Sequence, residues 1–98
     1  MARHTSVNLP AGVWTQLTNA DVTSITFQNM AGGDVFVCPT TSATAPTIYP
    51  PEVGQFSIRY QPGQGERNVL LSDLAGGQTM ARVYAYSQNG ATVAVSHA

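Results

Sequence analysis

Lysine is absent from this 98-residue sequence, and charged residues of any kind are scarce. Four Arg and five Asp or Glu make up 9% of the chain, against roughly 25% in an ordinary globular domain. The arginines are scattered, so they form no basic stripe of the kind that nucleic-acid binding needs. Because mixed surface charge keeps free monomers apart, this composition favours a protein that works packed against copies of itself or against a larger assembly.

Other absences narrow the possible classes further. The single cysteine, Cys38, has no partner for an intrachain disulfide, which is compatible with synthesis in a reducing compartment. No apolar run approaches the roughly 20 residues needed to span a bilayer. The first ten residues lack the apolar segment of a secretory signal. We therefore expect no membrane partner and no direct contact with nucleic acid.

Neutral polar residues take the place of charge, since 30 of the residues are Thr, Ser, Gln or Asn. Short β-branched and aromatic runs, separated by turn residues, predict about seven strands. In residues 22–29, Ile25 and Phe27 point one way and the polar residues between them point the other. Residues 68–74 fit either a strand or one helical turn with the leucines facing inward. The other expected strands are 5–9, 13–17, 35–38, 55–60, 80–87 and 91–97.

Turn signals suggest how these strands connect. Residues 31–34, with two glycines, predict a β-hairpin between strands 22–29 and 35–38. Asn89 and Gly90 predict a second hairpin with a type I′ turn, in which both central residues have positive φ. The fold class is therefore all-β, a small antiparallel β-sandwich or jelly-roll-like barrel. Residues 1–98 form a single domain, with a possible extended N-terminal arm (1–6) and a long proline-rich loop (40–51).

No catalytic or metal-binding constellation can be assembled from the sequence, so we expect no enzyme activity, no cofactor and no metal. Cys38 lies in an apolar run and is interpreted as a buried thiol, because a catalytic cysteine needs a nearby base. His4 and His97 would meet if the terminal strands paired, but no ligand spacing supports a metal site. The G-x-G of residues 63–65 has no following helix and is read as a turn.

Two further groups of side chains leave alternatives open. The five carboxylates include Asp21 and Asp34 beside turns, where Asp commonly caps the backbone. Glu66 and its neighbour Arg67 suggest a local or intersubunit ion pair. Trp14 and Tyr49 either pack against the domain or stack on sugar rings, which would make the chain a carbohydrate-binding module.

Three stretches, YQPGQGERNVLLSDLAGG, ARVYAYS and VAVSHA, resemble small structural proteins of tailed-bacteriophage virions. VWTQLTNADVTSITFQNMAGGDVFV is similar in style, and the resemblance covers most of the chain after Asn8. It implies a virion component made in the host cytoplasm. Within that class we favour a capsid decoration (cement) protein that bridges major-capsid subunits, and the alternative is a head-fibre or tail subunit. A homo-oligomer, with a trimer as the guess, suits such shells.

On this interpretation, contacts with the major capsid protein or other virion proteins come from segments 1–6, 40–51 and 62–67. The arginines would anchor the chain to partner carboxylates. The candidate interface residues are Arg3, Tyr49, Arg59, Glu66, Arg67 and Arg82.

Overall fold

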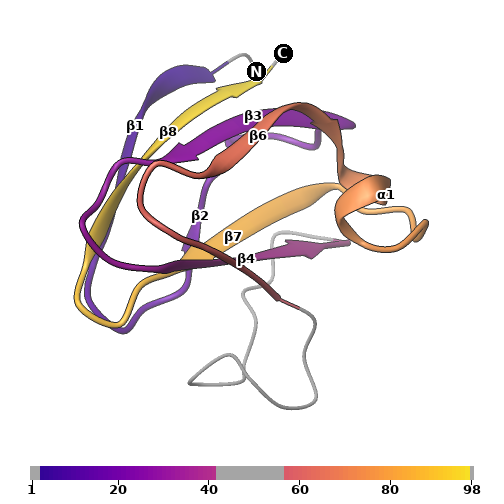
Figure 1. Cartoon of the computed structure of the whole chain (residues 1–98). Coiled ribbons are helices and arrows are strands. Elements are labelled where there is room, and N and C mark those ends of the chain that lie inside the picture. The colour runs from indigo at the N-terminus through magenta and orange to yellow at the C-terminus, as the bar shows by residue number, and fades with distance from the viewer. Residues whose placement is uncertain (1–2, 42–56, 98) are drawn as a thin grey trace.

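Two four-stranded antiparallel sheets make up the fold in the computed structural model, which describes residues 3–41 and 57–97 (Figure 1). The first sheet has the strand order β1-β8-β3-β6 and the second β2-β7-β4-β5. The strands are β1 Arg3–Leu9, β2 Thr15–Gln16, β3 Ser24–Asn29, β4 Val35–Thr40, β5 Ile58–Tyr60, β6 Gly65–Leu70, β7 Arg82–Tyr86 and β8 Ala91–His97. One helical turn, α1 Leu71–Leu74, follows β6. The predicted all-β antiparallel fold is confirmed, and the two sheets are compatible with a small sandwich.

The core lies between the two sheets and follows the predicted alternation. In β3, Ile25 and Phe27 are 1% and 3% exposed, and the valines at alternate positions of β4 and β8 are also buried. The Phe27 ring meets the Tyr60 ring edge to face with centroids 5.0 Å apart, which ties β3 of one sheet to β5 of the other. Each such large side chain contributes about 1.5–3 kcal/mol by leaving water.

Both predicted hairpins are wrong, because the chain crosses between sheets at each turn. β3 pairs with β6 and β8, whereas β4 pairs with β5 and β7. β7 and β8 likewise belong to different sheets. Only Gly90 has positive φ in the β7–β8 turn, so the turn is not type I′. Turn residues allow the chain to reverse direction, but they do not decide whether the next strand pairs with its predecessor or packs across from it.

The prediction of an extended N-terminal arm is also corrected, since residues 3–6 belong to β1 and pair with β8, beginning with Arg3↔His97. The predicted strand 5–9 is therefore confirmed, and only its first two residues, Arg3 and His4, were missed, because the beginning of the strand is polar, as an edge strand exposed on its outer face permits. Residues 68–74 combine the two alternatives, with β6 running to Leu70 and one helical turn after it. Thr40 ends β4, and residues 42–56, with most of the predicted loop and Tyr49, lie outside the described residues.

Asn29 ties three parts of the fold together at the end of β3. It is 1% exposed, and its Nδ2 donates to the carbonyls of Gly33 at 2.8 Å and Tyr60 at 3.0 Å. Its Oδ1 accepts from the backbone N–H of Ala31 at 2.9 Å. Its own backbone N–H and C=O bond to the β5–β6 turn. One side chain therefore holds the crossing to β4 and the end of β5 against β3.

Candidate interaction surface

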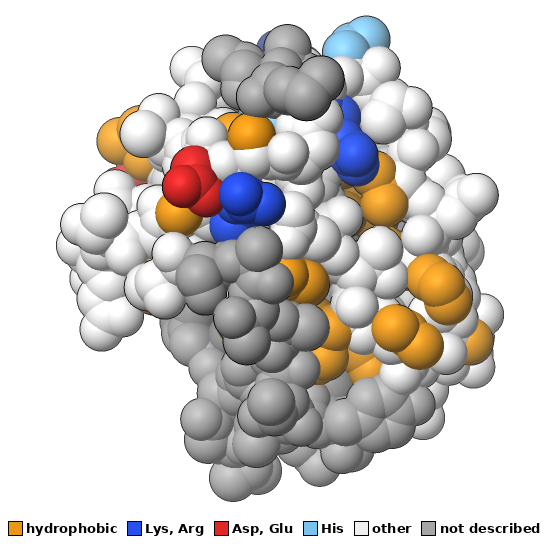
Figure 2. Space-filling model, turned by 180° about the vertical axis from the view of Figure 1, so that it is seen from behind, with side chains coloured by type: hydrophobic (Ala, Val, Ile, Leu, Met, Phe, Trp, Pro, Cys, Tyr) orange, Lys and Arg blue, Asp and Glu red, His pale blue; other side chains and the backbone are white. Residues whose placement is uncertain are grey.

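The outward side of β1, β8 and β3 carries no charged side chain. In β3 and β8 every second residue faces away from the core, as the buried residues between them show, and the register with β8 places residues 4, 6 and 8 of β1 on the same side. We call this surface the polar face. Its residues are His4, Ser6, Asn8, Ser24, Thr26, Gln28, Thr92, Ala94 and Ser96. Charged side chains are also sparse on the side of the molecule drawn in Figure 2.

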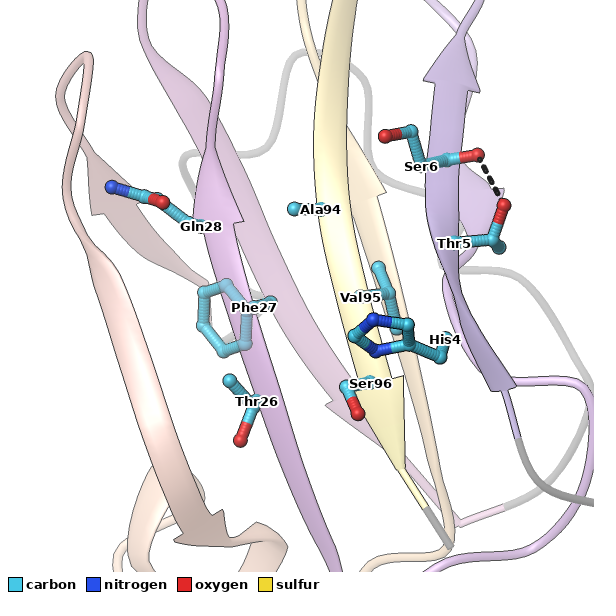
Figure 3. A pocket seen from close by; sticks show the side chains of 9 residues that line it. All are labelled: His4, Thr5, Ser6, Thr26, Phe27, Gln28, Ala94, Val95 and Ser96. Atoms are coloured by element: carbon cyan, nitrogen blue, oxygen red, sulfur yellow. Dashed lines mark hydrogen bonds between the residues drawn. The ribbon is translucent and has the colours of Figure 1, made fainter.

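A shallow hollow of about 310 Å³ lies in the middle of the polar face (Figure 3). Ala94 of β8 lies opposite Ser6 of β1 and Gln28 of β3, and His4 lies diagonally across from it, opposite Ser96. Since Ala94 and Ser6 carry short side chains while the neighbouring Gln28 and His4 carry longer ones, the sheet surface dips there. The rim offers hydroxyl, amide and imidazole groups that hydrogen-bond without a full charge. Such a hollow suits a neutral polar knob on a partner surface.

Two exposed apolar side chains lie at the ends of the polar face. Leu70 is 49% exposed and pairs with Ser24 in the β3–β6 register, so both point to the same side. Met30 is 59% exposed, and its N–H bonds to the carbonyl of Thr92, which continues the β3–β8 register. A neutral polar centre with apolar ends resembles the covered part of protein interfaces, where charged residues are depleted.

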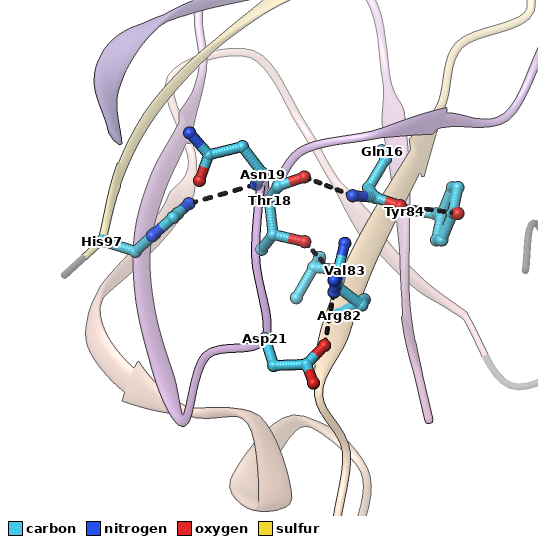
Figure 4. A network of polar contacts seen from close by, with 8 residues as sticks. All are labelled: Gln16, Thr18, Asn19, Asp21, Arg82, Val83, Tyr84 and His97. Atoms are coloured by element: carbon cyan, nitrogen blue, oxygen red, sulfur yellow. Dashed lines mark hydrogen bonds and ion pairs between the residues drawn. The ribbon is translucent and has the colours of Figure 1, made fainter. Parts of the chain in front are cut away.

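Two of the predicted interface arginines contact the chain itself. The Nη1 of Arg3 donates to the carbonyl of Leu17 at 3.3 Å. Arg82 forms an ion pair with Asp21 at 2.6 Å, and their side chains are 20% and 75% exposed. Both guanidinium groups therefore help to position the segment between β2 and β3, and Figure 4 shows the pair of Arg82 with Asp21.

The other predicted residues that the structure describes lie on edge strands. Arg59 of β5 approaches Asp34 at 3.7 Å, and an exposed pair of this kind contributes at most about 1 kcal/mol. Glu66 accepts a hydrogen bond from the Tyr60 hydroxyl at 3.1 Å. Arg67 is exposed on β6 and has no polar partner within residues 3–41 and 57–97. The five predicted residues that the structure describes thus lie on four different strands of two sheets and form no single cluster.

The two histidines point to opposite sides of the first sheet. His4 is exposed on the polar face, whereas His97 is 8% exposed and faces inward. The Nε2 of His97 accepts from the backbone N–H of Asn19 at 3.5 Å (Figure 4), which makes it part of a structural network. In the described part of the chain, no three His, Cys, Asp or Glu side chains gather as a metal site would need.

Cys38 and Trp14 were the other candidates for chemistry. Cys38 is 4% exposed, and burial raises the pKa of its thiol, so the interpretation as a buried apolar thiol is confirmed. Trp14 is half-buried, and its ring lies 5.4 Å from that of Tyr86 at 50°. Trp14 does not line the hollow on the polar face, and the Phe27 ring, which does, is 3% exposed and packs against Tyr60, so it offers no open face to a sugar ring.

The sequence held the signal for the polar face without revealing its meaning. Neutral residues at every second position of 4–8, 24–28 and 92–96 are visible in the sequence, but only the pairing of β1 and β3 with β8 brings these three rows together.

No helix in the described residues is long and apolar enough to cross a membrane. Comparison with family models, curated proteins and solved structures found no match for this chain.

Proposed function

We propose that this chain is a structural virion protein, a capsid decoration protein that binds across neighbouring major-capsid subunits. The observation that carries the proposal is the polar face, on which nine outward positions of three adjacent strands contain no Asp, Glu, Lys or Arg. The resemblance of its sequence to phage virion proteins supports the same assignment. The proposed work is cohesion, without a chemical reaction.

The energetic reason is the cost of burying charge. A partner that covers ionised side chains must replace their hydration, at several kcal/mol for each unpaired ion. Hydroxyl and amide groups cost far less and regain hydrogen bonds from the partner. Covering the polar face therefore costs little desolvation free energy, while the burial of Met30 and Leu70 favours binding because both side chains leave water.

The proposed partner is the major capsid protein, and the site of action is the assembled head. The β-sandwich supplies a rigid body, because each strand is held by its neighbours and by the core between the sheets. Contacts over a broad neutral surface also resist dissociation at high salt, since screening weakens mainly charge–charge attraction.

Cosedimentation with undecorated expanded capsids of the source phage tests the proposal. We expect the wild-type chain to bind at micromolar concentration. Ala94→Arg places a long cation in the hollow and is expected to weaken binding at least about tenfold, because the charge loses hydration when it is covered. Ala11→Arg, the same change at an exposed turn residue off the polar face, is the matched control and should bind as wild type. No cosedimentation of the wild-type chain overturns the proposal.

Two alternative functions predict different experimental results. A head-fibre or tail subunit predicts that antibodies against the chain label fibres or tails, whereas a decoration protein predicts labelling over the whole shell. A carbohydrate-binding module predicts glycan binding that Trp14→Ala abolishes. The half-buried ring of Trp14, tilted against Tyr86, gives this last alternative less support than the polar face gives to protein contact.

A further inference from the structure

The outer strands of the first sheet, β1 and β6, differ in how they meet solvent. β6 pairs irregularly with β3, with a register shift between Ile25 and Phe27. Asn68 has a positive φ of 49°, and Glu66 and Arg67 place charge on the strand. Bulges and charges of this kind prevent an edge from pairing with another chain. β6 is therefore a protected edge.

β1 has none of these devices. All seven of its residues pair with β8 without a register shift, and its residues 4–6 and Asn8 are exposed. Its only charged side chain, Arg3, bonds to Leu17 of its own chain. The edges of the second sheet, β2 and β5, are two and three residues long, which is too short for a stable new pairing. Among the described strands, β1 is thus the long, regular and neutral edge.

The hydrogen-bond pattern shows which backbone groups of β1 point outward. Met30 N–H donates to the carbonyl of Thr92 at 2.9 Å, so Thr92 and every second residue after it bond toward β3. The residues between them bond toward β1, because antiparallel strands alternate in this way. Their partners in β1 are Arg3, Thr5 and Val7. The N–H and C=O groups directed away from the sheet therefore belong to His4, Ser6 and Asn8.

We propose that β1 binds β1 of a second copy of this chain, antiparallel, about a two-fold axis at Ser6. In this register Ser6 lies opposite Ser6 of the second copy, and His4 lies opposite Asn8. The outward groups then face each other and form about six backbone hydrogen bonds between the copies. No like charges are opposed, because Arg3 lies opposite Leu9 of the second copy.

A second copy fits this edge for a symmetry reason. Antiparallel self-pairing is isologous, so one strand supplies both sides of the contact and the assembly closes as a dimer. Pairing with β6 of another copy would leave the β6 bulge and Asn68 against a regular strand. The dimer joins two four-stranded sheets into one continuous sheet and doubles the extent of the polar face.

Light scattering after gel filtration gives the first test. At about 100 μM we expect a mass twice that of the 10.3 kDa chain, decreasing on dilution. A mass of one chain overturns the proposal. A mass of three chains, the trimer suggested by the sequence, overturns it as well, because two-fold pairing of β1 cannot make a trimer.

Matched variants test the position of the contact. Ser6→Asp places two carboxylates across the axis, with Cα atoms about 5.5 Å apart, and is expected to weaken the dimer at least about tenfold, since like charges opposite each other destabilise a strand pair. Ser96→Asp makes the same change on the same face, one strand inward on β8, and should leave the dimer intact. Equal weakening by both variants overturns the proposal.

Two further variants guard against loss of folding. Ser6→Pro removes an outward N–H without removing a bond to β8, a position that proline tolerates, whereas Ser6→Ala keeps the N–H. Circular dichroism should show that both variants are folded, and light scattering should show that only the proline variant is monomeric. A folded, dimeric proline variant contradicts the pairing.

The inference does not rest on the virion role. If the chain is a dimer that does not bind capsids, only the decoration function is overturned. If it is a monomer that binds capsids, only the dimer is overturned.

Discussion

Replacing Asn29 by alanine should destabilise the protein far more than removal of an amide group usually does. The side chain is buried and makes three hydrogen bonds to backbone groups, two as donor and one as acceptor. Those backbone groups lie in the β3–β4 crossing and at the end of β5. The substitution removes all three hydrogen bonds at once, because alanine has no polar side-chain atom.

The magnitude follows from how buried each orphaned group is. The bond to the carbonyl of Tyr60 is buried, and losing it costs about 1–3 kcal/mol, the desolvation penalty of an unsatisfied group. The bonds to Gly33 and Ala31 are partly buried, so water partly replaces them at about 0.5–1.5 kcal/mol each. We expect a total near 3–4 kcal/mol, against a stability of about 5–15 kcal/mol for a domain of this size.

Urea unfolding followed by tryptophan fluorescence measures this difference. Asn19→Ala is the control, because Asn19 is exposed and bonds to His97 through its backbone, and it should stay within about 0.5 kcal/mol of wild type. Asn29→Asp keeps the shape but turns both donors into acceptors that face carbonyl oxygens. It should be at least as destabilising as the alanine at neutral pH. A loss below about 1 kcal/mol for Asn29→Ala would refute the role assigned to Asn29.

Two other predictions concern packing and pH. Gly65→Ala should lower the free energy of unfolding by about 2–3 kcal/mol through overpacking, because the added Cβ would clash with Phe27 O and lie 2.7 Å from Gln28 Cα. The control is Gly32→Ala, whose added Cβ meets nothing within 4 Å, and this variant should unfold at nearly the wild-type temperature. Equal melting temperatures for the two variants would contradict the prediction. Burial, and then Glu66, raise the pKa of Tyr60 above its usual value of 10.0. The folded state therefore holds the phenolic proton more tightly than the unfolded state, so this stabilisation is complete below about pH 10 and declines as pH rises further. Tyr60→Phe should flatten the fall in melting temperature above about pH 10, and an unchanged slope would count against this role.

The sequence predicts the elements of this fold better than their pairing. Alternation locates β3, and the buried Ile25 and Phe27 confirm its inward side. That signal is local, since it depends only on which side of one strand meets the core. Pairing depends on contacts between distant segments, and the turn residues near Gly33 and Gly90 fit a sheet-to-sheet crossing as well as a hairpin. Both hairpin predictions failed for this reason.

The candidate surface shows the same limit. Charged residues drew attention in the sequence because they are rare, but Arg3 and Arg82 bond within the chain. The partners of a long arginine side chain depend on the fold and cannot be read from its neighbours in sequence. The polar face consists of ordinary Ser, Thr, Asn and Gln residues that become one surface only when β8 lies between β1 and β3.

The place of β8 also has a consequence for synthesis on the ribosome. β1 and β3 do not pair with each other, and β8, which joins them, begins only at Ala91. Until that residue has emerged, β1 has no described strand to pair with, and its neutral backbone edge remains available to other nascent chains. Such distant pairing is slow to form and prone to aggregation. We expect fragments that end before β8 to aggregate or be degraded, because β3 can pair with β6 earlier but the complete first sheet can form only after β8 has emerged.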